Sequence, residues 1–270
     1  MKRFDKILQD IRSLKIQGAS NVAKSGIRAF LLQPNKKSAD RIISTRLTEP
    51  LMQNAVNYLL NSENPKKNAK NFFSYLKMAD IKIAKTGAKL IKNDMNIFTH
   101  CHSSTIASIL KYAKKHGKKF VVYNTETSPS LQGRIMAKEL IKSGIKVIHV
   151  VDTATEYSLK KCDLFLFGAD AFLPSGVVNK VGTEMYCQLA SLYKIPRYTA
   201  GISLKFTKKV KLEYRKPAEV WNEKEKLIIT INPAFDNVSK KLLTGVISEF
   251  GILTHRQFVK KAKENLRKWR

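Results

Sequence analysis

The sequence predicts an α/β protein in which a helical segment precedes a doubly wound parallel sheet. Two observations support this prediction. Apolar residues recur at helical spacing up to about residue 92, and from residue 95 short apolar runs alternate with amphipathic segments. Such alternation indicates right-handed strand–helix–strand crossovers, and therefore a parallel sheet.

The first 92 residues have the pattern of helices separated by prolines. Pro34, Pro50 and Pro65 divide this part of the chain. Apolar side chains fall on one helical face in its first and last segments: Phe4, Ile7, Leu8, Ile11 and Leu14, then Phe72, Leu76, Ala79 and Ile83. We therefore expect a helical domain at residues 1–92.

Six apolar runs of strand length follow. They are MNIFTH (95–100), KFVVYN (119–124), KVIHVVD (146–152), LFLFG (164–168), PRYTA (196–200) and KLIITIN (226–232). Helical segments lie between most of them. Residues 93–270 are thus predicted to form a Rossmann-like α/β domain that carries the ligand site.

Composition predicts a cytoplasmic protein. Three cysteines without a CxxC spacing indicate neither a disulfide framework nor a structural zinc site. No apolar run reaches the roughly 20 residues that span a bilayer, and the basic start of the chain lacks the apolar core of a signal peptide. We expect no membrane contact.

The formal net charge of +29 favours polyanionic partners or substrates, RNA among them. A lysine-rich solvated surface is the alternative. The segment at 256–270 is the candidate RNA site, because helical spacing would place Lys260, Lys263 and Arg267 on one face.

Polar residues gather where the predicted strands end. They are His100 to Ser104, Asn124 to Thr127, Asp152 and Thr153, and Gly168 to Asp170; the loop PSGVVNKVGT brings Asn179 and Lys180 to the same rim. Ligands of open α/β sheets bind beyond the carboxyl ends of the strands. The sequence therefore predicts a ligand site at this edge.

Cys101 and Asp170 are the candidate reactive residues of that edge. A helix beginning near Ser103 would favour both a thiolate at Cys101 and a bound phosphate. A buried Asp170 could transfer protons. A packed cysteine and a capping aspartate are the structural alternatives. Three consecutive residues on an extended segment alternate in direction, which disfavours a metal site at residues 100–102.

Several motifs occur together and in one order: IQGAS (16–20), STRLTEP (44–50), THCHSS (99–104), TETSPSLQG (125–133), VDTATEY (151–157), GAD (168–170), SGVVNKVGT (175–183) and NPAFD (232–236). This resembles the family that joins the α, β and δ subunits of translation initiation factor 2B to methylthioribose-1-phosphate isomerase and archaeal ribose-1,5-bisphosphate isomerase.

The resemblance implies that Cys101 and Asp170 are catalytic, because they match the cysteine and aspartate of the isomerases. It also implies contacts to phosphate and sugar from Gln17, Gly18, Ala19, Ser20, Arg46, Ser103, Ser104, Gln132, Gly133, Asn179, Lys180 and Lys205.

Three positions depart from the isomerase pattern. Gln17 and Ser128 stand where the isomerases have arginine, and Ile202 stands where they have glutamate. Glutamine and serine cannot reproduce the bidentate fork by which arginine binds phosphate. Regulatory subunits commonly lack the cysteine–aspartate pair, so retention of both residues favours catalysis.

We therefore expect an aldose–ketose isomerase acting on a C1-phosphorylated pentose similar to ribose-1,5-bisphosphate, with no metal and no cofactor. The alternative is a non-catalytic regulatory subunit that binds initiation factor 2 or senses a nucleotide or sugar phosphate. The resemblance implies a homodimer or higher homo-oligomer, and the apolar residues between 246 and 253 offer a candidate surface.

Overall fold

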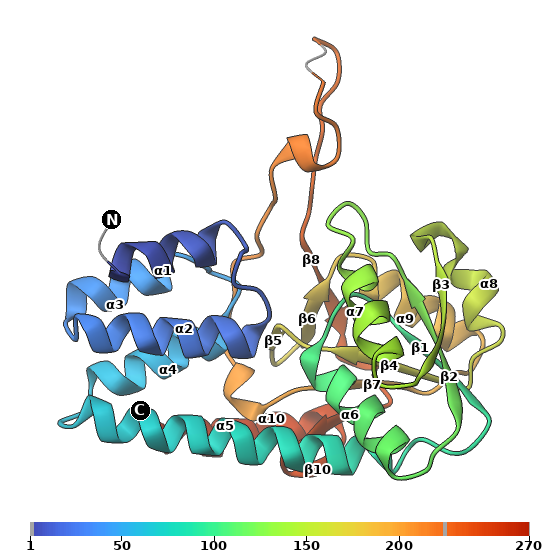
Figure 1. Ribbon diagram of the computed structural model, residues 1–270, viewed down its shortest axis with the longest axis horizontal. Helices are drawn as coiled ribbons and strands as arrows, with labels where there is room; N and C mark the ends of the chain where they lie inside the picture. Colours follow the sequence, from blue (N-terminus) through green and yellow to red (C-terminus); the bar gives the residue numbers. More distant parts are fainter. Residues whose placement is uncertain (1–2, 224–225, 270) are drawn as a thin grey trace.

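The computed structural model describes residues 3–223 and 226–269 (Figure 1). One large hydrophobic core joins the amino-terminal helices to the sheet, and a small second cluster lies around Ala171 and Val178. The amino-terminal part consists of α1 (Arg3–Arg12), α2 (Ala19–Leu32), α3 (Lys36–Ile43), α4 (Pro50–Leu60) and α5 (Pro65–Ala88). Pro50 and Pro65 occupy the first turns of α4 and α5, where a missing N–H costs no helical hydrogen bond. The predicted helices of this part are confirmed.

The second part is a seven-stranded sheet with helices packed on it. Its strands are β1 (Met95–Thr99), β2 (Phe120–Thr125), β3 (Lys146–Val150), β4 (Leu164–Gly168), β7 (Arg197–Ala200), β9 (Gly245–Ser248) and β10 (Gly251–Leu253). Its helices are α6 (Ser104–Lys115), α7 (Gln132–Ile141), α8 (Thr155–Leu159), α9 (Thr183–Leu192) and α10 (His255–Arg267). The strand order is β10-β9-β7-β4-β1-β2-β3, and β10 alone runs antiparallel to its neighbour. The predicted α/β class is confirmed.

The chain changes direction across this sheet between β1 and β4. Ile97 of β1 is paired with Val122 of β2 on one side and with Leu164 of β4 on the other. Such a switch point leaves a crevice beyond the carboxyl ends of the two central strands. Cys101 follows β1 and Asp170 follows β4, so the topology brings both residues to that crevice.

A small second sheet completes the crevice. It has the order β5-β6-β8 and consists of β5 (Ala171–Phe172), β6 (Gly176–Lys180) and β8 (Phe235–Ser239). Asp170 N–H donates to the carbonyl of Val178 at 2.8 Å, which ties the end of β4 to β6. Asn179 and Lys180 thereby reach the same edge as Asp170.

Residues 214–233 form an extended arm that projects from the body in Figure 1; the structure describes its residues 214–223 and 226–233. Its two limbs are joined at the base, where Arg215 N–H donates to Asn232 O at 2.8 Å. The strand predicted at 226–232 is wrong, because this run lies in the arm without a strand neighbour among the described residues. Leu227 is 98% exposed and Ile229 is 89% exposed.

The division predicted at residue 92 follows a change of element type, but the two parts pack together. Helix α5 packs against α6, β9 and β10. Helix α10 buries Phe258, and Trp269 contacts Phe72 of α5 edge to face at 5.1 Å. Across the described residues, no helix combines the length and apolar character needed to cross a membrane.

The expected contact surface at 246–253 is only partly available. Val246 and Ile247 of β9 are fully buried, so the prediction of a contact surface is wrong at these two positions. Ile252, on the edge strand β10, is 38% exposed.

Candidate active site

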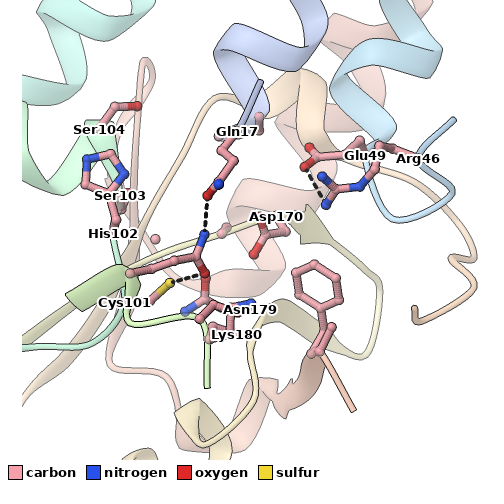
Figure 2. A pocket seen from close by; sticks show the side chains of 18 of the residues that line it. Gln17, Arg46, Glu49, Cys101, His102, Ser103, Ser104, Asp170, Asn179 and Lys180 are labelled. Atoms are coloured by element: carbon pink, nitrogen blue, oxygen red, sulfur yellow. Dashed lines mark hydrogen bonds and ion pairs between the residues drawn. The ribbon is translucent and has the colours of Figure 1, made fainter. Parts of the chain in front are cut away.

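One pocket lies between the amino-terminal helices and the carboxyl ends of β1 and β4 (Figure 2). Every predicted site residue except Gly133 lines it: Gln17, Gly18, Ala19, Ser20, Arg46, Cys101, Ser103, Ser104, Gln132, Asp170, Asn179, Lys180 and Lys205. Gly133 does not line the pocket. It faces the end of β2, where a Cβ would fall 1.7 Å from the carbonyl oxygen of Thr125. This glycine lets α7 pack closely on the end of β2 and does not face the pocket.

Three helices begin at the pocket. Gly18 precedes α2 with a φ of 81°, Ser103 caps α6, and Leu131 precedes α7. Gly18 supplies no side-chain cap, so the first N–H groups of α2 have no capping side-chain oxygen; at the start of α7, in contrast, the Gly133 N–H donates to the carbonyl of Glu126 at 3.0 Å. Helix amino termini bind anions through such N–H groups and the helix dipole. The pocket thus has a built anion-binding wall.

Cys101 is held in a left-handed backbone conformation, with a φ of 63°, that non-glycine residues rarely adopt. Its N–H donates to Thr127 Oγ1 at 3.0 Å, and its Sγ donates to Gln132 Oε1 at 3.3 Å. Burial raises the pKa of the thiol to about 11, although Lys180 acts in the opposite direction. Burial thus favours the neutral thiol at pH 7, the opposite of the effect expected from the helix start, and the protonation state of Cys101 stays a prediction.

The two histidines beside Cys101 have different roles. His100 Nε2 faces the carbonyl of Val181 at 3.0 Å, and its Nδ1 lies 2.7 Å from Thr125 Oγ1. Because a carbonyl only accepts, Nε2 bears the proton; burial lowers the pKa of His100 to about 4 and keeps the ring neutral. His102 faces Glu139 at 2.8 Å. The consecutive side chains do not converge on one point.

Asp170 lies among cations and amides. Burial raises the pKa of its carboxyl, while Lys205, Lys180 and Arg46 pull that pKa down. In the orientation that satisfies both ends of its amide, Asn179 donates to Asp170 Oδ2 at 3.2 Å. Lys205 is buried and donates to the carbonyl of Ala169, so its ammonium lies beside the same strand end. Burial and the neighbouring cations thus act on the pKa of Asp170 in opposite directions, which is how proteins adjust a carboxyl for proton transfer.

Two carboxylates of the pocket were not predicted. Glu213, at the base of the arm, accepts from Arg46 Nε at 3.1 Å and from Thr48 N–H at 3.1 Å. Glu49 immediately precedes α4, and its side chain faces Arg46 Nη2 at 3.4 Å. Glu49 belongs to the STRLTEP motif, whose Arg46 is a predicted site residue, so the sequence offers a reason to include it. For Glu213, which is 167 residues from Arg46, the sequence offers none.

Gln17 joins the amino-terminal helices to the catalytic candidates. Gln132 Nε2 donates to Gln17 Oε1 at 2.8 Å, and Gln132 in turn accepts from Cys101 (Figure 2). An uncharged amide chain therefore occupies the place where an arginine was expected in an isomerase. The other two departures lie outside the pocket lining: Ser128 donates to Glu126 at 3.1 Å, and Ile202 is buried.

Comparison with known proteins identifies the family. Residues 23–255 match the model of the initiation factor 2 subunit family. The chain belongs to this family. It is 33% identical to ribose 1,5-bisphosphate isomerase of Methanocaldococcus jannaschii over 91% of this chain and 89% of the relative. It is 31% identical to a putative translation initiation factor eIF-2B subunit 2-like protein of Pyrococcus furiosus, over 92% of this chain and 95% of that one.

A solved member of the family has the same architecture. The translation initiation factor eIF-2B of Pyrococcus horikoshii OT3 superposes with a TM-score of 0.87 at 28% identity, over 96% of this chain and 99% of that chain. The predicted family is therefore confirmed, and its named members include both an isomerase and an initiation factor.

Proposed function

We propose that this protein is an aldose–ketose isomerase acting on a C1-phosphorylated pentose. The observation that supports it best is the meeting of a buried thiol, Cys101, and a desolvated carboxyl, Asp170, in one pocket walled by three helix amino termini. Relatives of nearly full length named ribose 1,5-bisphosphate isomerase support the same substrate class.

The phosphate fits the wall formed by the starts of α2, α6 and α7, where N–H groups and Lys180 favour a dianion. Ring opening requires a proton on the ring oxygen, because the C1 phosphate prevents spontaneous opening. The shift then removes a proton from C2, returns one to C1 and takes one from the C2 hydroxyl. Cys101 and Asp170 share these transfers through an enolate-like intermediate, and no metal or organic cofactor is required.

The test is turnover in D₂O. Purified protein is offered ribose-1,5-bisphosphate and methylthioribose-1-phosphate, and the products are read by NMR. We expect a ketose product with deuterium at C1, because a proton that passes through Cys101 or Asp170 exchanges with solvent. Deuterium at C1 would support proton transfer through exchangeable groups such as Cys101 and Asp170, and absence of any ketose would refute the activity.

A regulatory subunit is the second candidate, and Gln17 is the observation that favours it. The Gln17–Gln132 amide pair offers no charge to a phosphate, and a relative named as a putative initiation factor subunit matches over 92% of this chain. Binding of purified initiation factor 2 in the absence of turnover on either sugar would support this function. Turnover without such binding would exclude it.

We also propose that the protein forms a homo-oligomer through its arm. The run at 226–231 has the composition of a strand, yet Leu227 and Ile229 are exposed and have no strand neighbour in the described chain. The same run of a second copy could pair with it about a two-fold axis, which would bury both. Sedimentation at micromolar concentration should then show no free monomer.

We further propose that α10 binds RNA. The apolar side of α10 is buried. Its polar side lines a surface hollow together with Lys240, and the α10 side chains there include Arg256, Lys260, Lys263, Glu264 and Arg267. Removing α10 would take Phe258 out of the core and expose Phe172, against which it packs, so charge variants are the appropriate test.

The RNA test changes three cations of α10 to glutamine, namely Lys260, Lys263 and Arg267. Labelled tRNA is titrated at two salt concentrations. We expect weaker binding and a log–log salt slope smaller by up to about three, because three phosphate contacts release fewer counterions when they are lost. The matched control changes the exposed Lys66, Lys67 and Lys70 of α5. Equal affinities for both triple variants would remove α10 as an RNA site.

A further inference from the structure

Glu49 is a buried pocket residue with an unused oxygen. The residue is 2% exposed and lines the pocket, and its Oε1 faces Arg46. Its Oε2 has no hydrogen-bond partner among the described residues. A buried polar atom without a partner is costly, and such atoms in native proteins usually await a ligand or water. Glu49 precedes α4 without capping it, so helix formation does not explain the side chain.

Charged groups of both signs surround Glu49. Asp170 and Glu213 face it as carboxyls, and Arg46 and Lys205 face it as cations. Arg46 already binds Glu213 through Nε, and Lys205 donates to a backbone carbonyl. Arg46 is thus shared by two carboxyl groups, Glu213 and Glu49, and a dianion placed here would compete with both for it.

The two sides of the pocket are thus chemically different. Figure 2 shows Ser103 and Ser104 on one side of Asp170 and the Glu49–Arg46 pair on the other. The serines belong to the start of α6, which favours an anion. A second phosphate beside Glu49 would instead have to displace the Glu213 carboxylate from Arg46.

We propose that Glu49 binds a hydroxyl group of the sugar and makes the pocket selective for a pentose that carries a single phosphate. This inference rests on the proposed isomerase function and deepens it by naming the substrate class. Burial raises the pKa of Glu49 to about 8, so near pH 7 the protonated carboxyl can both donate to and accept from a hydroxyl. Gln17 also fits a substrate with a single phosphate, because its amide can bind a hydroxyl but offers no charge to a second phosphate.

The test compares ribose 1-phosphate with ribose 1,5-bisphosphate on wild type, Glu49→Gln and Glu49→Ala. We expect wild type to have a kcat/KM at least about tenfold higher for the monophosphate. Glu49→Gln should stay within a fewfold of wild type, because an amide also donates and accepts. Glu49→Ala should lose about tenfold on the monophosphate, mainly through KM, since one hydrogen bond to bound substrate is lost.

The matched control is Glu156→Gln, which changes an exposed carboxylate paired with Lys160 outside the pocket. Preference of wild type for the bisphosphate, or an unchanged KM in Glu49→Ala, would overturn the inference. If wild type converts neither sugar, the proposed function fails, and calorimetric affinities of the same proteins for both sugars decide about Glu49. Equal affinity of wild type and Glu49→Ala for the monophosphate would then refute it.

Discussion

The protonation state of Cys101 can be tested by its alkylation rate as pH rises. Only the thiolate reacts with iodoacetamide. A cysteine with the ordinary pKa of 9.0 is about one-tenth thiolate at pH 8, whereas a pKa of about 11 leaves about one part in a thousand. We therefore expect Cys101 to react about 100-fold more slowly than a cysteine of an unfolded peptide at pH 8.

The slope of that rate against pH is the diagnostic quantity. Restricted access to a buried sulfur lowers the rate at every pH, but it leaves the slope unchanged. Because the thiolate fraction grows tenfold per pH unit below the pKa, log rate should rise by about one per unit through pH 10. Two variants should shift the curve in opposite directions. Asp170→Asn removes a charge that raises the pKa of Cys101, and Lys180→Gln removes a charge that lowers it.

Peptide mass spectrometry after timed alkylation separates the three cysteines. Cys162 and Cys187 serve as internal references, because burial raises the pKa of both thiols, that of Cys162 to about 12. A Cys101 rate that reaches a plateau near pH 7 would show a thiolate stabilised by the helix end. That result would refute the neutral-thiol reasoning and the roles assigned to it.

Three further predictions use the same protein. Cys101→Ser and Asp170→Asn should each lower isomerase turnover by about 10²-fold or more with an unchanged circular dichroism spectrum, as expected for proton-transfer groups, and full activity in either variant would exclude that residue. Gly133→Ala should lower the melting temperature, because its Cβ would overlap Thr125 O and overpacking costs about 1–3 kcal/mol; unchanged melting would contradict the packing role. Changing both Leu227 and Ile229 to serine should release monomers in sedimentation, and an unchanged oligomer would exclude the arm as the interface.

The sequence predicted the central strands of the sheet but missed β9, although Gly245–Ser248 is buried throughout. LFLFG at 164–168 is fully buried in β4, so its composition and its role agree. KLIITIN at 226–232 is also rich in apolar, β-branched residues but lies in the exposed arm. Composition cannot distinguish these cases, because burial depends on neighbours that are distant in the chain. The strand at Phe235–Ser239 was missed because its run FDNVS alternates with polar residues.

The site was predictable to the extent that strand ends determine it. Cys101 and Asp170 follow adjacent central strands, and the rule for open α/β sheets places such residues together. The protonation of Cys101 was not predictable, because a helix start and burial act on a thiol in opposite directions and only the structure shows how far the thiol is buried. Glu213 reaches Arg46 only because the base of the arm folds over the pocket.

The net charge of +29 does not concentrate where the reaction is proposed. Arg46 is bound by Glu213, Arg215 is bound by Glu219, and Lys205 donates to a carbonyl. Burial favours the neutral form of Cys101. The surface charge can therefore draw an anionic sugar toward the protein, an effect that salt screens. Inside the pocket, we propose that recognition depends on helix amino termini, Lys180, amides and Glu49. The helix amino termini favour a phosphate, and Glu49 favours a hydroxyl. Selection among phosphopentoses therefore depends on whether the end of the sugar that faces Glu49 carries a hydroxyl or a phosphate.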